Sequence, residues 1–271
     1  MIIIGSLVGL SVGKLFIAGI VPGILMGVGL MAYISIYAKR KNMAKRPRAS
    51  FKEQLAATKN ALLTLGLPVL ILYTIMAGIA SPTESAVMGV LYALILTVFV
   101  YRTIKLKDLF HVLMQSSVST GSIMITVAGG VIYGWIATYL GIGDAINELL
   151  TGISDNKYVI LLVINLILLL LGMVLEAIPI ILLMAPILFP IASDLGIDPI
   201  HFSVIIIVNL MIGLVTPPIG LHLFITSSIA KVPISGVIKS SLPFVAVLLV
   251  VLLLVTYFPE ISMFLPNLLN P

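Results

Sequence analysis

One acid inside a long apolar region stands out for its chemistry. Glu176 lies in GMVLEAIP (172–179), a segment that begins at Gly172 and interrupts the apolar run from 158 to 192. A charged side chain at the centre of a membrane costs about 2.5–3.5 kcal/mol on insertion scales, so it is expected only where something compensates it. We interpret Glu176 as a cation ligand or as a hydrogen-bond acceptor that closes a hairpin tip. The alternative is a tip that reaches the polar headgroups and solvates Glu176 there.

A second interruption, GLVTPPIG at 213–220, combines residues that expose backbone oxygens. Its two prolines lack amide hydrogens and prevent a helix from continuing, and its two glycines permit unusual dihedral angles. Unwound carbonyls and a threonine hydroxyl form the oxygen-rich kind of site that hard cations prefer. An ordinary proline kink is the alternative. The candidate binding residues are Gly213, Thr216, Pro217, Pro218 and Gly220, and the candidate Na⁺ ligands are Gly213, Thr216 and Glu176.

Further polar residues lie close to these interruptions. Asn165 and Asn209 occur in apolar helices, where amides can form hydrogen bonds between helices. Asn209 is the nearer to the second break, so we include it among the candidate binding residues. His222 follows that break inside an apolar half-helix, where it is either packed and hydrogen-bonded or in contact with a substrate.

The composition indicates a membrane protein. The chain has 271 residues, of which 61% are hydrophobic and 9% charged, and its mean hydropathy is +1.26. Ordinary soluble domains carry roughly 25% charged residues, so a soluble enzyme, a disordered protein and a nucleic-acid binder are all disfavoured. The apolar runs are too long for the alternating strands of a β-barrel. The chain has no cysteine, and it contains no HExxH, GxSxG or Walker motif, so an intramembrane enzyme is also disfavoured.

Apolar runs and helix-start signals define the elements that position the two breaks. Residues 2–12 are too few to span a bilayer at about 1.5 Å of rise per residue. Ser81, Pro82 and Glu84 form a capping-box start, and Asp198 with Pro199 starts another helix. Residues 142–152 are predicted to form a short amphipathic helix at the membrane surface, with Leu150 on its apolar face. The predicted full spans are 15–38, 60–80, 82–101, 119–140 and 242–258, and the interrupted elements are 158–194 and 199–230.

The distribution of basic residues predicts the orientation in the bilayer. Placing 39–59, 102–107 and 231–239 on the cytoplasmic side leaves only Lys14 and Lys157 of the 15 Lys and Arg residues for the other side. The chain must then cross an even number of times between 107 and 231. Segment 158–194 is therefore predicted to enter and leave by the same face, as a re-entrant hairpin whose tip is the first break. A re-entrant hairpin together with a broken helix is typical of secondary transporters, in which half-helix N-termini face anionic substrates.

Over essentially the whole chain, the sequence resembles the large membrane subunit (DctM-like) of tripartite ATP-independent periplasmic (TRAP) transporters. The matching stretches are SVGKLFIAGIVPGILMG (11–27), SPTESAVMGVLYALI (81–95), LGMVLEAIPIILLMAPILFPIA (171–192), GIDPIHFSVIIIVNLMIGLVTPPIGLHLF (196–224) and YFPEISMFLPNLL (257–269).

The resemblance implies a Na⁺-coupled symporter of the bacterial inner membrane that imports organic acids such as C4-dicarboxylates or sialic acid. Its implied partners are a small membrane subunit (DctQ-like), a periplasmic substrate-binding protein (DctP-like) and the N-terminal repeat of the large subunit. The implied fold is all-α and polytopic, namely the second inverted repeat of an elevator-type fold similar to the ion-transporter superfamily. Gly172, Glu176, Gly213, Thr216, Pro217, Pro218 and Gly220 are implied to line one Na⁺ site and one wall of the substrate cavity.

The sequence departs from the family pattern at two residues and in the length of chain that it covers. Glu176 stands where the family usually has Asp, and His222 where it often has Asn. The first repeat's hairpin and Pro-Pro break are expected to precede residue 1, so the chain alone is expected not to transport. The alternatives are a truncated, non-transporting remnant or scaffold protein, and a channel.

With this resemblance, the predicted organisation has six parts. They are the end of a first broken helix and the following span (1–38), a cytoplasmic basic loop (39–59), scaffold helices (60–140), an amphipathic surface arm (141–157), a transport part (158–258) and a periplasmic tail (259–271).

Overall fold

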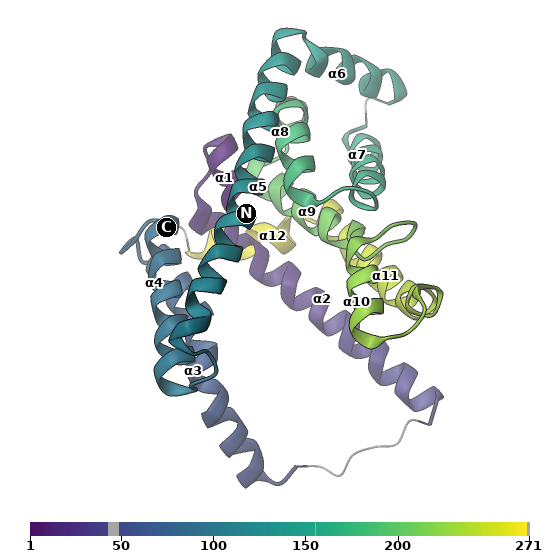
Figure 1. Cartoon of the computed structure of the whole chain (residues 1–271). Coiled ribbons are helices and arrows are strands. Elements are labelled where there is room, and N and C mark those ends of the chain that lie inside the picture. The colour runs from purple at the N-terminus through teal and green to yellow at the C-terminus, as the bar shows by residue number, and fades with distance from the viewer. Residues whose placement is uncertain (43–48, 155, 270–271) are drawn as a thin grey trace. The chain divides into compact units, whose positions relative to one another are not determined.

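Helices make up all the regular structure that the computed structural model describes, which comprises residues 1–42, 49–154 and 156–269. Figure 1 shows their arrangement along the chain. The helices are α1 (Ile2–Val8), α2 (Val12–Arg40), α3 (Phe51–Met76), α4 (Pro82–Leu94) with its π-helical continuation η1 (Ile95–Val100), α5 (Leu106–Tyr139), α6 (Ile142–Ile153), α7 (Lys157–Gly172), α8 (Ala177–Asp194), α9 (Pro199–Gly213), α10 (Leu221–Ala230), α11 (Ile234–Tyr257) and α12 (Pro259–Leu269).

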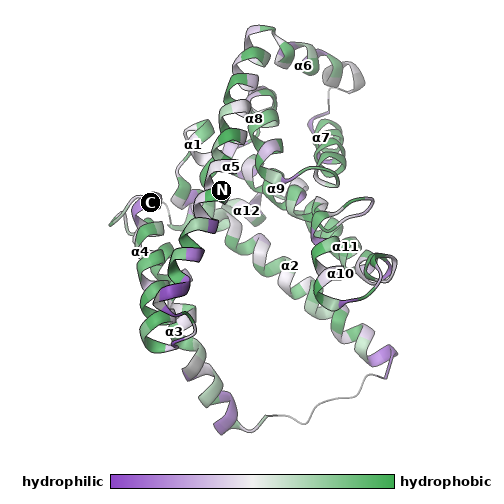
Figure 2. Cartoon of the chain, viewed as in Figure 1, coloured by the Kyte–Doolittle hydropathy of each residue, from purple (hydrophilic) through white to green (hydrophobic). Residues whose placement is uncertain are grey.

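The helices are long and apolar enough for a polytopic membrane protein, as the composition predicts. Within the described residues, 5 helices are long and apolar enough to span a bilayer, or up to 6 if the bent helix α3 is counted as one span. Helices α7, α9 and α10 are apolar but shorter. In Figure 2 most of the ribbon has the green of hydrophobic residues, and the ends of α2 and α3 that flank the uncoloured segment have the purple of hydrophilic ones.

The predicted helix starts are confirmed in atomic detail. At α4 the amide of Glu84 donates to Ser81 Oγ (3.3 Å) and the amide of Ser81 donates to Glu84 Oε2 (2.7 Å), which is a complete capping box. At α9 the Asp198 carboxylate accepts from the amides of Ile200 (2.8 Å) and His201 (3.1 Å). These caps fix where the two helices begin, and α9 carries the second break.

Several boundaries differ from the apolar spans. Helix α3 begins at Phe51, not at residue 60, because Ser50 and Glu53 form a second capping box inside the predicted basic loop. Helices α5 and α11 likewise begin before residues 119 and 242, and most of the predicted tail is the helix α12. Lys45, Arg46 and Arg48 of the basic cluster, the end of the tail at 270–271 and the side chain of Leu150 lie outside the described residues.

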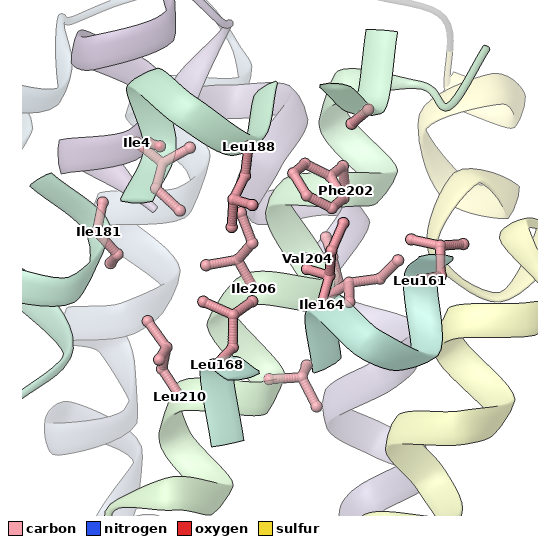
Figure 3. Packing of buried hydrophobic residues seen from close by; sticks show 14 of the residues in the cluster. Ile4, Leu161, Ile164, Leu168, Ile181, Leu188, Phe202, Val204, Ile206 and Leu210 are labelled. Carbon is pink, nitrogen blue, oxygen red and sulfur yellow. The ribbon is translucent and has the colours of Figure 1, made fainter. Parts of the chain in front are cut away.

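The chain forms two compact units, Lys41–Ile125 and a larger unit of Met1–Arg40 with Thr126–Pro271. In the larger unit, α9 is the central helix and packs against α7, α8, α2 and α11. Phe202, Val204, Ile206 and Leu210 of α9 lie among Ile164 and Leu168 of α7 and Leu188 of α8 (Figure 3). The division into transport and scaffold parts stays a prediction.

Small residues allow α5 to approach α8 closely, as the Gly-rich sequence of this span suggests. A Cβ at Gly130 would lie 2.6 Å from Leu182 Cβ, and one at Gly134 would lie 3.0 Å from Pro186 Cγ. The predicted amphipathic arm is α6, whose Ile142 and Ile146 pack against the core of the larger unit.

Candidate functional site

The first break separates two helices that run in opposite directions. Helix α7 ends at Gly172 and α8 begins at Ala177, and the two pack against each other as a hairpin (Figure 1). Residues 173–176 form the non-helical tip. The predicted hairpin and its interruption are therefore present.

The second break follows α9 and is closed by its own backbone. The Thr216 amide donates to the carbonyl of Gly213 (2.9 Å), and the His222 amide donates across the loop to the carbonyl of Leu214 (3.1 Å). The peptide bond between Pro217 and Pro218 is cis. Gly220 has a φ of 53°, in the left-handed region that favours glycine, and a Cβ there would lie 2.8 Å from the Thr216 carbonyl oxygen.

The two breaks lie against each other. A Cβ at Gly213 would lie 2.7 Å from Gly172 Cα and 2.7 Å from the Gly172 carbonyl carbon, so this approach of the backbones requires a glycine at position 213. The Gly220 amide also donates to the carbonyl of Met173 (3.0 Å). The hairpin tip and the broken helix, far apart in the sequence, thus form one backbone-lined region.

The amide groups at the start of α8 are available to an anion. Four other helices, α3, α4, α7 and α9, have side-chain caps at their N-termini, whereas α8 has Glu176 at the N-cap without a side-chain capping bond. Within the described residues no hydrogen bond of the Ala177 or Ile178 amide is found. Free amides and the positive end of the helix dipole together favour a negative charge at this end.

Two predicted cation ligands occupy different surroundings. Glu176 is exposed at the hairpin tip. Thr216 is 7% exposed, and its hydroxyl donates to the carbonyl of Ile212 (2.6 Å). Because the proton of Thr216 is used within the chain, its hydroxyl oxygen remains available only as an acceptor. A hard cation needs oxygens in this state.

The predicted role of Asn209 in joining helices is confirmed. Its Nδ2 donates to the backbone oxygen of Asn165 (2.8 Å) and to Asn165 Oδ1 (2.7 Å), and Asn165 Nδ2 donates to Thr256 Oγ1 (3.0 Å). These amides connect α7, α9 and α11 in the apolar core, and Asn209 Oδ1 is buried without a partner. A contact of Asn209 with ion or substrate stays a prediction.

His222 lies on α10 directly after the second break, with its side chain exposed. No hydrogen bond of its ring is found in the part of the chain that the structure describes. Its side chain is thus not packed against the described residues, and contact with a substrate stays a prediction.

The sequence did not single out Met173 or Thr256. Met173 acts through its carbonyl group, which any residue supplies, so no residue pattern marks it. Thr256 lies far along the chain from Asn165 and Asn209, and only the packing of α11 brings the three together.

The fold and the site define a polytopic helical membrane protein with discontinuous helices, the class that contains membrane transporters. The comparisons with known sequences identify the family. Residues 1–261 match the family described as the tripartite ATP-independent periplasmic transporter, DctM component, and the chain belongs to this family.

Named relatives of the chain are permeases and not enzymes. It is 42% identical over 95% of its length to the C4-dicarboxylate TRAP transporter large permease protein DctM of Pseudomonas aeruginosa, of which it covers 60%. It is 38% identical over 99% of its length to the sialic acid TRAP transporter large permease protein SiaM of Vibrio cholerae, of which it covers 63%. It is 37% identical over 94% of its length to the isethionate TRAP transporter permease protein DctMQ of Oleidesulfovibrio alaskensis. The chain thus spans less than two thirds of these relatives.

Proposed function

We propose that this chain is the C-terminal part of the large membrane subunit of a Na⁺-coupled TRAP transporter that imports an organic acid. The observation that carries the proposal is the contact between the two breaks, at Gly172 with Gly213 and at Gly220 with Met173. Discontinuous helices that meet at membrane depth are the usual place for substrate and coupling ion in secondary transporters. The fold proposed is the second inverted repeat of an elevator-type transporter.

The proposed Na⁺ site consists of the Thr216 hydroxyl, the Gly213 carbonyl and the Glu176 carboxylate. The substrate carboxylate binds at the free amides of Ala177 and Ile178. Glu176 is adjacent to those amides, so without a cation its charge repels the substrate. Na⁺ neutralises Glu176 and thereby favours binding of the anion, and by linkage the anion favours binding of Na⁺.

We propose the substrate, the partners and the location of the chain from its membership of the family. The substrate is a carboxylate such as a C4-dicarboxylate or sialic acid, as the names of two relatives state for those proteins. Its proposed partners are a DctQ-like small membrane subunit, a DctP-like periplasmic binding protein and the N-terminal repeat of the large subunit. The proposed location is the bacterial inner membrane, with the basic loops in the cytoplasm and the C-terminus in the periplasm.

The test of transport measures uptake of radiolabelled succinate, sialic acid or isethionate into proteoliposomes that hold the complete large subunit, the small subunit and the binding protein. We expect uptake to need an inward Na⁺ gradient that K⁺ does not replace. Thr216→Ala should raise the half-saturating Na⁺ concentration about tenfold, because a hydrogen bond or ligand to a charged group contributes about 1.5–3 kcal/mol. Thr138→Ala is the matched control, because its hydroxyl likewise donates to a carbonyl of its own helix, that of Gly134 (2.9 Å).

Glu176 tests the electrostatic coupling. We expect Glu176→Gln to weaken the Na⁺ dependence of uptake and Glu176→Asp to retain it. Glutamine carries no negative charge for Na⁺ to neutralise, whereas aspartate does. Unchanged Na⁺ dependence in both Glu176→Gln and Thr216→Ala would place the coupling site elsewhere. Stable membrane insertion with no Na⁺-dependent binding or uptake would favour the scaffold or remnant, and unsaturable flux would favour a channel.

A further inference from the structure

A groove between α10 and α11 lies outside the region of the two breaks. It has a volume of about 500 Å³, within the range of roughly 300–1,000 Å³ typical of ligand clefts. Its lining is mostly apolar with hydroxyl groups among the apolar side chains, and consists of Thr226, Ala230, Val232, Gly236, Val237, Ser240, Ser241 and Phe244. Such a lining suits a hydrocarbon chain with a polar end.

The turn beside the groove is fixed by hydrogen bonds. Ser227 Oγ donates to the carbonyl of Val232 (2.7 Å), and the Val232 amide donates to the carbonyl of Ser227 (3.3 Å). Lys231 takes a left-handed conformation at the end of α10, with its amide also bonded to the Ser227 carbonyl. The groove is therefore formed before any ligand arrives.

Two exposed lysines stand next to groove-lining residues in the sequence. Lys231 precedes the lining residue Val232, and Lys239 precedes Ser240. Both are exposed, and in the described chain neither side chain makes an ion pair or a hydrogen bond. No Asp or Glu occurs in α2, α9, α10 or α11. Of the helices packed against α11, only α12 carries an acid, Glu260, at the opposite end of α11.

Aromatic residues mark the depth of the groove in the bilayer. Phe244 in the groove wall packs edge-on against Tyr33 of α2, with ring centroids 4.9 Å apart, and Tyr33 neighbours Tyr37. Lys39 and Arg40 follow at the end of α2. Aromatic side chains followed by basic ones are typical of the level of the lipid headgroups.

From these observations we propose that the groove between α10 and α11 binds an anionic phospholipid, whose acyl chain lies against Val237 and Phe244 and whose phosphate lies between Lys231 and Lys239. Basic pockets between membrane helices recognise anionic headgroups in this way. The lipid holds the end of the broken helix against α11. The inference needs the membrane location of the chain but not its transport activity.

The experiment is native mass spectrometry of the full chain released from nanodiscs that contain phosphatidylglycerol and phosphatidylcholine in equal amounts. We expect the protein to retain phosphatidylglycerol preferentially. The double variant Lys231→Gln, Lys239→Gln should lower apparent affinity for phosphatidylglycerol at least tenfold and leave phosphatidylcholine unchanged. Lys157→Gln is the matched control, because Lys157 lies over the ring of Tyr158, away from the groove.

A steric variant tests the groove itself. Gly236 lines the groove and a Cβ there meets no atom within 4 Å, so we expect the side chain of Gly236→Leu to occupy the groove and both lipids to be lost. Gly23→Leu is its control, since Gly23 on α2 has equally open space. Equal lipid retention by wild type and Gly236→Leu would overturn the proposal, as would unchanged lipid preference in the double lysine variant.

Two further outcomes also contradict the proposal. If glycerol 1-phosphate displaces phosphatidylglycerol at equal concentration, the site binds a free anion and not a lipid. If Val237→Cys, in this cysteine-free chain, cross-links to a protein partner in native membranes, a protein segment covers the groove.

Discussion

At the scale of single residues, the contact between Gly172 and Gly213 is asymmetric. A Cβ at Gly213 meets two backbone atoms of Gly172 at 2.7 Å, whereas a Cβ at Gly172 meets Gly213 Cα at 3.2 Å. Backbone atoms cannot rotate away as side chains do. An alanine at position 213 would therefore push α7 and α9 apart. The glycine pair therefore determines how closely the two breaks approach.

We expect Gly213→Ala to destabilise the protein by about 1–3 kcal/mol, the range for overpacking, and Gly172→Ala to cost less. The measurement is the melting temperature of the purified protein in detergent. Gly27→Ala is the control, because its Cβ meets nothing within 4 Å and alanine favours the helix. Equal melting temperatures for Gly213→Ala and wild type would show that the breaks do not pack through this contact.

The buried amides give a second residue-scale prediction. Asn209 donates to the backbone oxygen and to Oδ1 of Asn165, and only the bond to Oδ1 is lost in Asn165→Ala, so the single alanine variants and the double variant form a thermodynamic cycle for that bond. We expect a coupling energy of about 0.6–2 kcal/mol, the range for side-chain hydrogen bonds between membrane helices. The cycle is measured from the stability of each variant in detergent, and strictly additive effects would contradict the interaction.

At the scale of the elements, α5 and α8 offer a matched pair of glycines. Gly130 faces α8, where its Cβ would lie 2.6 Å from Leu182 Cβ, while a Cβ at neighbouring Gly129 meets nothing within 4 Å. Both changes to alanine gain the same helix propensity, about 1 kcal/mol. We expect Gly129→Ala to raise the melting temperature and Gly130→Ala to lower it. The opposite order would mean that α5 packs by its other face.

The sequence predicts elements well where the rules are local. Ser81 with Glu84 and Asp198 with Pro199 define helix starts within a few residues, and both breaks lie where proline, glycine or an acid interrupts apolar runs. The early start of α3 at Phe51 also has a local signal, the capping box of Ser50 and Glu53, but the basic residues around it favour the prediction of a loop. Contacts between breaks could not be predicted, because they depend on how α7 and α9 pack.

At the scale of the whole molecule, the distribution of basic residues predicts which side each loop occupies. Ser193 near the end of α8 and Ser235 at the start of α11 are exposed and should lie on opposite sides of the membrane. With single cysteines at these positions, a membrane-impermeant maleimide should label Ser193→Cys from the periplasm and Ser235→Cys from the cytoplasm. Labelling of Ser193→Cys from the cytoplasm would refute the predicted re-entry of the hairpin, and labelling of both from one side would refute the crossing of segment 199–230.

The Gly172–Gly213 contact also has an evolutionary consequence. Position 213 cannot acquire a larger residue unless the two backbones first separate, and position 172 tolerates one only with a smaller shift, so a change at one alters which changes are tolerated at the other. New substrate preferences are thus expected to arise around the tips while this pair stays fixed. Chimeras that exchange the hairpin with a relative should function only when a glycine stands on both sides of the junction.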